Sequence, residues 1–152
     1  MATTRMSVMG TRHLISAGHY LAAHAGFQIL EAGGNAVDAG VAAGIAIGVL
    51  QTDKVNFGGV APQLIYTAKN RQVHCIDGLG VWPRAITPDY FIRKHGGRIP
   101  KGVERCVVPA APDAWLTALE HFGTMSFGDV AAHAIRFARD GYPMHPMMSD
   151  FI

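Results

Sequence analysis

The chain has 152 residues, of which 49% are hydrophobic and 16% are charged, and its formal net charge is +2. This length corresponds to one domain. The small, scattered positive charge argues against a nucleic-acid-binding protein. Cys75 and Cys106 have neither metal-ligand nor redox spacing, so we expect two free thiols, no metal and no cofactor.

Residues 1–12 lack the continuous apolar stretch of a signal peptide. We therefore expect a loose arm at this end, no membrane association and a cytoplasmic protein. The apolar run at 14–17 predicts a short strand. Apolar residues then recur at helical spacing, which predicts a first helix from about 19 to 32.

Residues 29–50 are the most informative stretch. Gly33 suits the left-handed conformation that ends a helix. Asn35 is a good N-cap for a second helix, and Asp38 would face that helix's free amides. Residues 36–50 carry no charge except Asp38, and a helix that is apolar all round is a buried helix. Fifteen residues are too short for a membrane span, which needs about 20, so we expect a core helix packed against a sheet.

The middle of the chain predicts a hairpin. Gly58-Gly59 marks a place where the backbone turns or passes close to another segment. The runs 63–67 and 72–76 are typical of strands, and Lys69-Asn70 between them suits a turn. Antiparallel pairing of the two strands follows.

The remainder predicts helices. Thr87, followed by a proline, begins a short helix that runs to about His95. Further helices are expected at 113–121, at 127–139 and from 146 to the end of the chain. In the helix at 127–139 we expect four side chains to face inward: Val130, Ala134, Ile135 and Phe137.

Three histidines raise the possibility of a metal site: His13, His19 and His24. The last two are five residues apart, which places them off one helical face, and no third ligand is near. We therefore expect solvated or capping histidines.

Residues 17–39 read Ala-Gly-His-Tyr-Leu-Ala-Ala-His-Ala-Gly-Phe-Gln-Ile-Leu-Glu-Ala-Gly-Gly-Asn-Ala-Val-Asp-Ala. This stretch resembles the opening of the γ-glutamyltranspeptidase family, whose members are N-terminal-nucleophile hydrolases. The resemblance continues in order through residues 87–91, 108–109, 118–124 and 134–143, and so covers most of residues 13–150.

The resemblance implies an α+β fold, namely the N-terminal portion of an αββα sandwich. It also implies a proenzyme that cuts itself to expose a threonine nucleophile, whose own α-amine serves as base. In the family that threonine and its oxyanion donors lie in the C-terminal small subunit, beyond residue 152. The last two residues are apolar and carry no capping signal. We therefore interpret residues 1–152 as a partial domain from the large subunit, without catalytic residues, whose partner is the remainder of the proenzyme.

One substrate contact of the family is expected within this stretch. In the family, the arginine of an Asp-aromatic-Arg motif shortly after the second strand binds the α-carboxylate of the γ-glutamyl group. Here Leu79 stands at that position, five residues before Arg84, the candidate substitute for substrate binding. The family's run of four glycines is also reduced to Gly58-Gly59. These departures predict altered specificity for a γ-glutamyl or other amide substrate.

The sequence suggests three functions. The first is an amide-hydrolysing or acyl-transferring enzyme of the N-terminal-nucleophile class. The second is a non-catalytic or differently specific relative with a structural or binding role. A nucleotide-binding domain that uses Gly33-Gly34 is the weakest, because the three-glycine phosphate fingerprint is missing.

Overall fold

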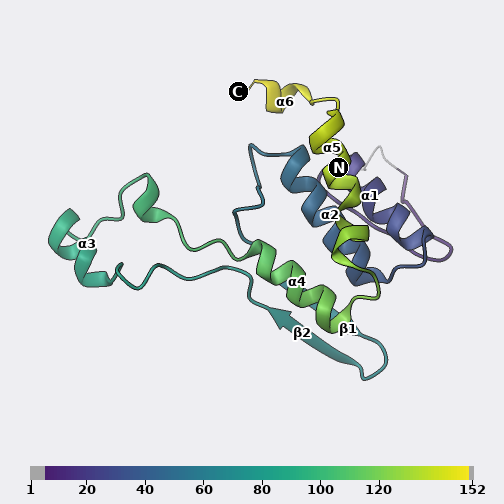
Figure 1. Ribbon diagram of the computed structural model, residues 1–152, viewed down its shortest axis with the longest axis horizontal. Coiled ribbons are helices and arrows are strands. Elements are labelled where there is room, and N and C mark those ends of the chain that lie inside the picture. The colour runs from purple at the N-terminus through teal and green to yellow at the C-terminus, as the bar shows by residue number, and fades with distance from the viewer. Residues whose placement is uncertain (1–5, 151–152) are drawn as a thin grey trace.

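The computed structural model describes residues 6–150 (Figure 1). Its regular elements, in chain order, are α1 (Tyr20–Glu31), α2 (Ala36–Leu50), β1 (Gln63–Thr67), β2 (Gln72–Ile76), α3 (Pro88–His95), the 3-10 turn η1 (Val103–Arg105), α4 (Ala111–Phe122), α5 (Phe127–Asp140) and α6 (Pro146–Ser149). None of the helices in this described part is long and apolar enough to cross a membrane. Two predicted features extend outside it, the start of the N-terminal arm at residues 1–5 and the end of the last helix at 151–152.

The first helix and the turn after it form as predicted. His19 is the N-cap of α1, and its Nδ1 accepts a hydrogen bond from the Leu21 amide at 3.2 Å. The expectation of a capping histidine is thus confirmed at this position. Gly33 has a φ of +95°, so the chain leaves α1 through a conformation that favours glycine.

The N-terminus of α2 is a reciprocal capping box. Asn35 Oδ1 accepts from the Val37 and Asp38 amides at 2.8 and 3.1 Å, while Asp38 Oδ2 accepts from the Asn35 amide at 2.8 Å. Two otherwise unpaired amides at the helix start and the Asn35 amide are thereby satisfied. The prediction of Asn35 as N-cap with Asp38 facing the amides is confirmed.

α2 is the central helix, and it packs mainly on other helices. It contacts α1, α5 and α4, and its buried residues include Val41, Ile45 and Leu50. The prediction of a core helix is confirmed, but the expected sheet contact is incomplete. The β1–β2 hairpin lies beside α2 with a cavity between them, because one face of the helix carries glycines that do not reach the strand.

The hairpin has the predicted strands and orientation. β1 and β2 pair antiparallel, with Leu64 opposite Cys75 and Tyr66 opposite Val73. Those four side chains occupy one face, since side chains alternate along a strand, and they are exposed. Ile65 lies on the other face and joins the hydrophobic core. Within residues 6–150 this is a two-stranded sheet.

Two sequence predictions are wrong in detail. Ile135 is 56% exposed, because it lies about 140° around α5 from Val130, at 100° per residue, whereas Ala131 takes the inward position. Residues 14–17 form no strand, because no described segment pairs with them. Ile15 packs instead against the helical core, near Gly26 of α1.

A buried carboxylate joins the first half of the chain to the second. The Asp38 side chain is fully buried, and it accepts hydrogen bonds from the Thr124 hydroxyl at 2.6 Å, the Thr124 amide at 2.9 Å and the Met125 amide at 3.2 Å. Asn35 Nδ2 also donates to the Phe122 carbonyl at 2.6 Å. The capping box of α2 is therefore bonded to the connection between α4 and α5.

The same contact explains Gly123 at the end of α4. Its φ of −77° requires no glycine. A Cβ at this position, however, would lie 2.7 Å from Asp38 Oδ1 and 2.7 Å from the Leu119 carbonyl oxygen. Glycine is needed here because the carboxylate passes so close to the backbone.

The hydrogen bonds also set the protonation state of Asp38. Burial alone would raise its pKa, but the bonds from the Thr124 hydroxyl and from the amides of Asn35, Thr124 and Met125 outweigh burial and leave the pKa below its usual value. A carboxyl whose folded pKa is depressed stabilises the fold above its unfolded pKa of about 3.9. That contribution is lost as the pH falls through the folded pKa.

We predict that Asp38→Asn lowers the free energy of unfolding by about 3 kcal/mol, because an amide group cannot accept all of these bonds. The matched control is Asp129→Asn, at the same position of the exposed capping box of α5, which should cost about 0.5–1 kcal/mol. Urea unfolding at pH 7 measures both. At pH 3 the free energies of unfolding of Asp38→Asn and wild type should differ less than at pH 7. Equal losses of stability for Asp38→Asn and Asp129→Asn at pH 7 would contradict a special role for the buried carboxylate.

Candidate functional site

An arm of residues 78–110 leaves the hairpin, carries α3 at its far end and returns to α4 (Figure 1). Its root is held by backbone hydrogen bonds. The Ala61 amide donates to the Gly78 carbonyl at 2.9 Å, and the Val108 amide donates to the Val81 carbonyl at 2.8 Å. Three chain segments therefore run together at the start of the arm.

Glycines allow this close approach. Gly78 and Gly80 have φ of +57° and +80°, and a Cβ on either would lie within 2.3 Å of a carbonyl oxygen, that of Ala61 or Val108 respectively. Gly59 was predicted to lie where backbones meet, and its carbonyl accepts from the Ala110 and Ala111 amides at the start of α4. That prediction is confirmed.

Both residues singled out for substrate binding lie on this arm. Leu79 is at the root and is 48% exposed, and Arg84 is exposed farther along. Neither lines either of the two cavities described below. Trp82 packs its ring against Phe91 of α3 at a centroid distance of 5.1 Å, so it covers the small core of the arm.

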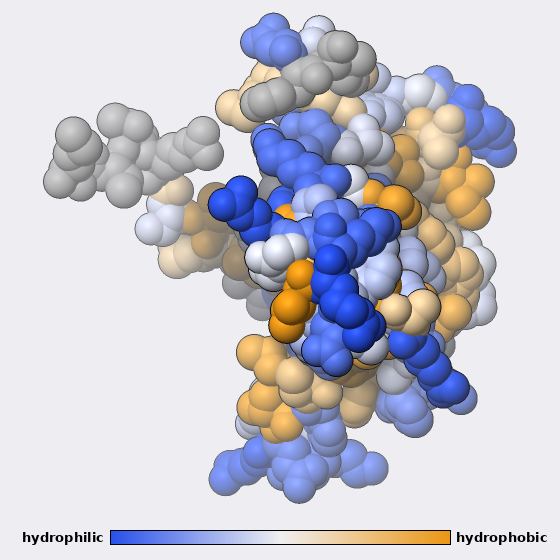
Figure 2. Space-filling view, turned by 90° about the vertical axis from the view of Figure 1, so that its left-hand side faces the viewer, coloured by the Kyte–Doolittle hydropathy of each residue, from blue (hydrophilic) through white to orange (hydrophobic). Residues whose placement is uncertain are grey.

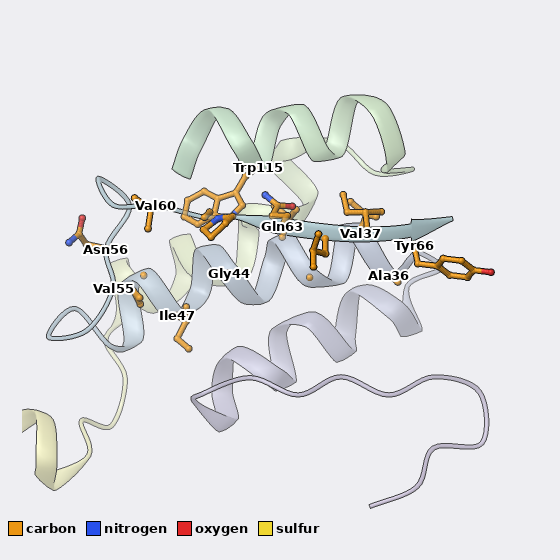
Figure 3. Close-up of a pocket in the computed structure, with 17 residues that line it drawn as sticks. Ala36, Val37, Gly44, Ile47, Val55, Asn56, Val60, Gln63, Tyr66 and Trp115 are labelled. Carbon is orange, nitrogen blue, oxygen red and sulfur yellow. The ribbon is translucent and has the colours of Figure 1, made fainter. Parts of the chain in front are cut away.

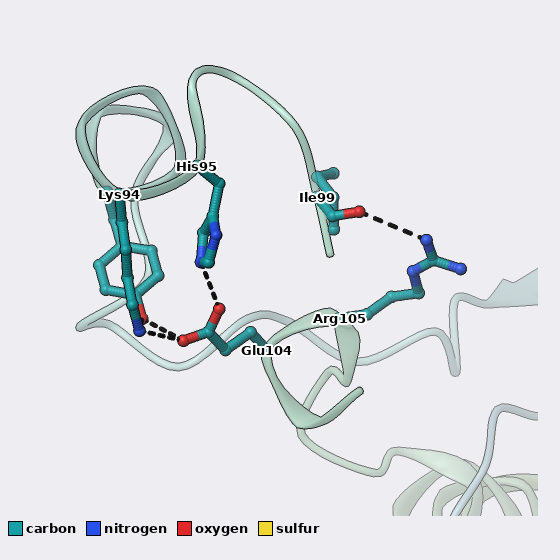
Figure 4. Close-up of polar contacts among 6 residues, drawn as sticks. Lys94, His95, Ile99, Glu104 and Arg105 are labelled. Atoms are coloured by element: carbon teal, nitrogen blue, oxygen red, sulfur yellow. Dashed lines mark hydrogen bonds and ion pairs between the residues drawn. The ribbon is translucent and has the colours of Figure 1, made fainter. Parts of the chain in front are cut away.

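The tip of the arm is joined by one carboxylate, Glu104 (Figure 4). It accepts from Tyr90 at 2.5 Å, pairs with His95 Nε2 at 2.6 Å and forms an ion pair with Lys94. The bonds from Lys94 and Tyr90 lower the pKa of Glu104 to about 2. Hydrophilic side chains gather in the middle of the face that Figure 2 presents, which looks at the molecule from the side of the arm. The contacts of Glu104 with Tyr90, Lys94 and His95 form a clasp between α3 and η1, and this clasp involves no buried charge.

A cavity of about 490 Å³ lies between α2 and β1 (Figure 3). From α2 it is lined by Ala36, Val37, Gly40, Val41, Gly44, Ile47 and Gly48, and from the hairpin side by residues 60–66. Trp115 of α4 points into it beside Gln63, and no charged residue lines it. The Gln63 Nε2 is buried and has no hydrogen-bond partner among the described residues. Sequence reasoning missed this cavity, although the four-residue spacing of the α2 glycines is visible in the sequence.

A second cavity, of about 480 Å³, is lined by residues that include His74, His121 and Thr67. Thr67 Oγ1 lies 3.3 Å from His74 Nε2, a pairing that resembles a nucleophile and its base. The Thr67 hydroxyl, however, also bonds to Asn70 and to the Gln72 carbonyl. Its role is thus to close the hairpin turn.

The profile of the Gamma-glutamyltranspeptidase family matches residues 22–152. The chain belongs to this family. The resemblance in the Gly-Gly-Asn-Ala-Val-Asp-Ala turn and in the later segments is therefore confirmed.

Named relatives agree with this assignment. The chain is 33% identical over 140 residues to the Glutathione hydrolase-like YwrD proenzyme of Bacillus subtilis, covering 91% of this chain and 26% of the relative. It is 35% identical over 153 residues to the Acylase ACY 1 proenzyme of Pseudomonas sp. strain V22, covering 94% and 27%. The chain thus spans about a quarter of the length of these relatives.

The fold agrees with a solved member. The crystal structure of Helicobacter pylori gamma-glutamyltranspeptidase matches with a TM-score of 0.86 and 26% identity, covering 95% of this chain and 43% of that chain. The predicted fold class, the N-terminal portion of an N-terminal-nucleophile hydrolase, is confirmed. The matched part of this family contributes the capping turn, the hairpin and the arm.

We predict that Glu104→Gln loosens the tip of the arm without weakening the helical core. Loss of the charge removes the ion pair with Lys94, so the amides of α3 should exchange on the order of tenfold faster in hydrogen–deuterium exchange. The urea concentration at the midpoint of unfolding should be the same for Glu104→Gln as for the control variant Glu120→Gln, which changes an exposed glutamate on α4. A global loss of stability specific to Glu104→Gln would mean that the arm is part of the core.

Proposed function

We propose that this chain forms the N-terminal part of the large subunit of a γ-glutamyltranspeptidase-like proenzyme. The whole protein would hydrolyse an amide bond or transfer its acyl group, using a threonine that self-cleavage exposes at the start of the small subunit. The observation that carries the proposal is the family match across residues 22–152. Two relatives are named proenzymes, one glutathione hydrolase-like and one an acylase, which supports the remainder of the proenzyme as the partner.

The role of this chain in the whole enzyme would be to support the active site. The resemblance assigns the nucleophile and oxyanion donors to the small subunit. The Asp38 hydrogen bonds hold α2 against the connection between α4 and α5, and the backbone bonds at the root of the arm hold the segment after β2 in place. In the family that segment faces the substrate carboxylate. The cytoplasmic location expected from residues 1–12 stays a prediction.

Leu79 limits which substrates the enzyme would bind. Leucine has no donor for a carboxylate, and the family arginine at this position would supply a planar pair of N–H groups. We expect the enzyme to accept amide substrates but to bind γ-glutamyl donors weakly. Arg84, exposed on the same arm, is the candidate for any carboxylate contact that remains.

We predict that Leu79→Arg in the full-length enzyme raises kcat/KM for L-γ-glutamyl-p-nitroanilide roughly ten- to a hundredfold. A charge-assisted hydrogen bond contributes about 1.5–3 kcal/mol, which corresponds to that range. Release of p-nitroaniline measures the change.

Val81→Arg is the matched control, since Val81 is an exposed apolar residue two positions along the same arm, and it should change little. If the wild-type enzyme already has high activity and Arg84→Ala abolishes it, then Arg84 holds the carboxylate. A full-length protein that neither cleaves itself nor hydrolyses any amide would refute the proposed function.

A further inference from the structure

Two histidines cap two different helices and lie beside each other. His19 is the N-cap of α1, and its Nδ1 accepts a hydrogen bond from the Leu21 amide at 3.2 Å. His145 is the N-cap of α6, and its Nδ1 accepts from the Met148 amide at 3.1 Å. The centroids of the two imidazole rings are 6.0 Å apart. This contact joins the start of α1 to α6, more than a hundred residues later in the chain.

The two caps require the same protonation state on both rings. A ring nitrogen that accepts a hydrogen bond carries no proton, so each neutral imidazole must carry its proton on Nε2. A second proton would have to enter at Nδ1, where it would meet the amide hydrogen of the cap. Each histidine can therefore cap its helix or become a cation, but it cannot do both.

The surroundings of the pair disfavour a positive charge. His19 is 5% exposed, and the Nε2 of His145 is buried without a hydrogen-bond partner among residues 6–150. Burial lowers the pKa of His19, and the neighbouring His145 lowers it further. His19 also lies at the N-terminus of the twelve-residue α1, where the helix dipole opposes a cation. Acid therefore favours an arrangement in which the two rings are separated and solvated.

The other groups beside the pair do not offset this effect. Tyr20 stacks on His19 at a ring-centroid distance of 4.7 Å, and a phenol stays neutral below about pH 10. From the end of α2, the uncharged Gln51 donates to the carbonyl of Gly18, the residue before His19, at 3.5 Å. Asp150, at the end of α6, is exposed, and within the described chain its carboxylate has neither a hydrogen bond nor an ion pair with the two histidines.

The pair helps to hold α6 on the helical core. Met148 of α6 is 1% exposed, and its sulfur lies 3.9 Å from Tyr142 Oη. The Tyr142 hydroxyl donates to the Val49 carbonyl of α2 at 2.9 Å. Figure 1 shows α6 at the end of the molecule opposite the hairpin. A helix of four residues is too short to be stable by itself, so the position of α6 depends on these few contacts.

We propose that His19 and His145 form an acid-sensitive latch, which holds α6 against the start of α1 while both imidazoles are neutral and releases it when they are protonated. Two cations at this separation would repel each other, and each would lose its capping bond. The latch should respond near pH 6.5, where a free imidazole titrates. The loss of stability at Asp38 occurs at a much lower pH, because the pKa of that carboxyl lies below its usual value. The latch lies within this chain and does not rest on the proposed function.

Hydrogen–deuterium exchange on the wild-type full-length protein tests the latch without any mutation. Protection is compared at about pH 7.5 and about pH 5.5, on either side of the imidazole titration, after correction for the intrinsic pH dependence of exchange. The amides of Met148, Ser149 and Asp150, which bond within α6, should lose protection roughly tenfold or more at the lower pH. The amides of α2 should keep theirs. Unchanged protection of α6, or an equal loss in α2, would overturn the proposal.

The double variant His19→Asn/His145→Asn separates titration from capping. Asparagine is a good N-cap whose side-chain oxygen accepts the same amide bond, but it does not titrate. The double variant should therefore have the same α6 protection at both pH values. His121→Asn, at an exposed histidine of α4, is the matched control and should show the wild-type loss. A loss of α6 protection at the lower pH that persists in the double variant would show that other groups cause it, and the latch would be wrong.

Discussion

The arrangement of this chain depends on one buried carboxylate. Asp38 caps the helix in which it lies, and it also accepts hydrogen bonds from Thr124 and Met125, more than eighty residues later in the chain. A charge taken out of water without such partners would be strongly destabilising. Because every partner comes from a turn or a helix end, satisfying the carboxylate also fixes how α2 meets α4 and α5, and through α4 the position of the hairpin and the root of the arm.

The residues that hold the fold are different from the exposed residues of the arm. The backbone bonds at Gly59 and Gly78 and the close approach at Gly80 need small residues, and the capping turn needs the side chains of Asn35 and Asp38. These positions therefore tolerate few substitutions. Leu79 and Arg84 lie on the arm with exposed side chains, and we propose that a change there alters which substrate is bound without disturbing the core. A family member can therefore keep this fold while it departs from the family's sequence at an exposed position of the arm.

Local features could be predicted from the sequence. The capping box, the hairpin and α3 each follow from residues within a few positions of one another, and each forms as expected. Features that depend on distant partners could not be predicted. The bonds from Thr124 to Asp38 and the Glu104 clasp join segments that no spacing rule connects. Residues 14–17 have strand composition but no pairing partner among the described residues, and the inward face of α5 was misjudged at Ile135. The role of Arg84 stays a prediction.

A double-mutant cycle between Asp38 and Thr124 tests the central claim most directly. Urea unfolding of wild type, Asp38→Asn, Thr124→Val and the double variant gives the energy with which the two side chains act together. If the carboxylate joins the two halves of the chain as described, the effects of the single substitutions should be non-additive by about 1–2 kcal/mol. Additive effects, within about 0.3 kcal/mol, would show that Asp38 stabilises only its own helix and would contradict this account of the fold.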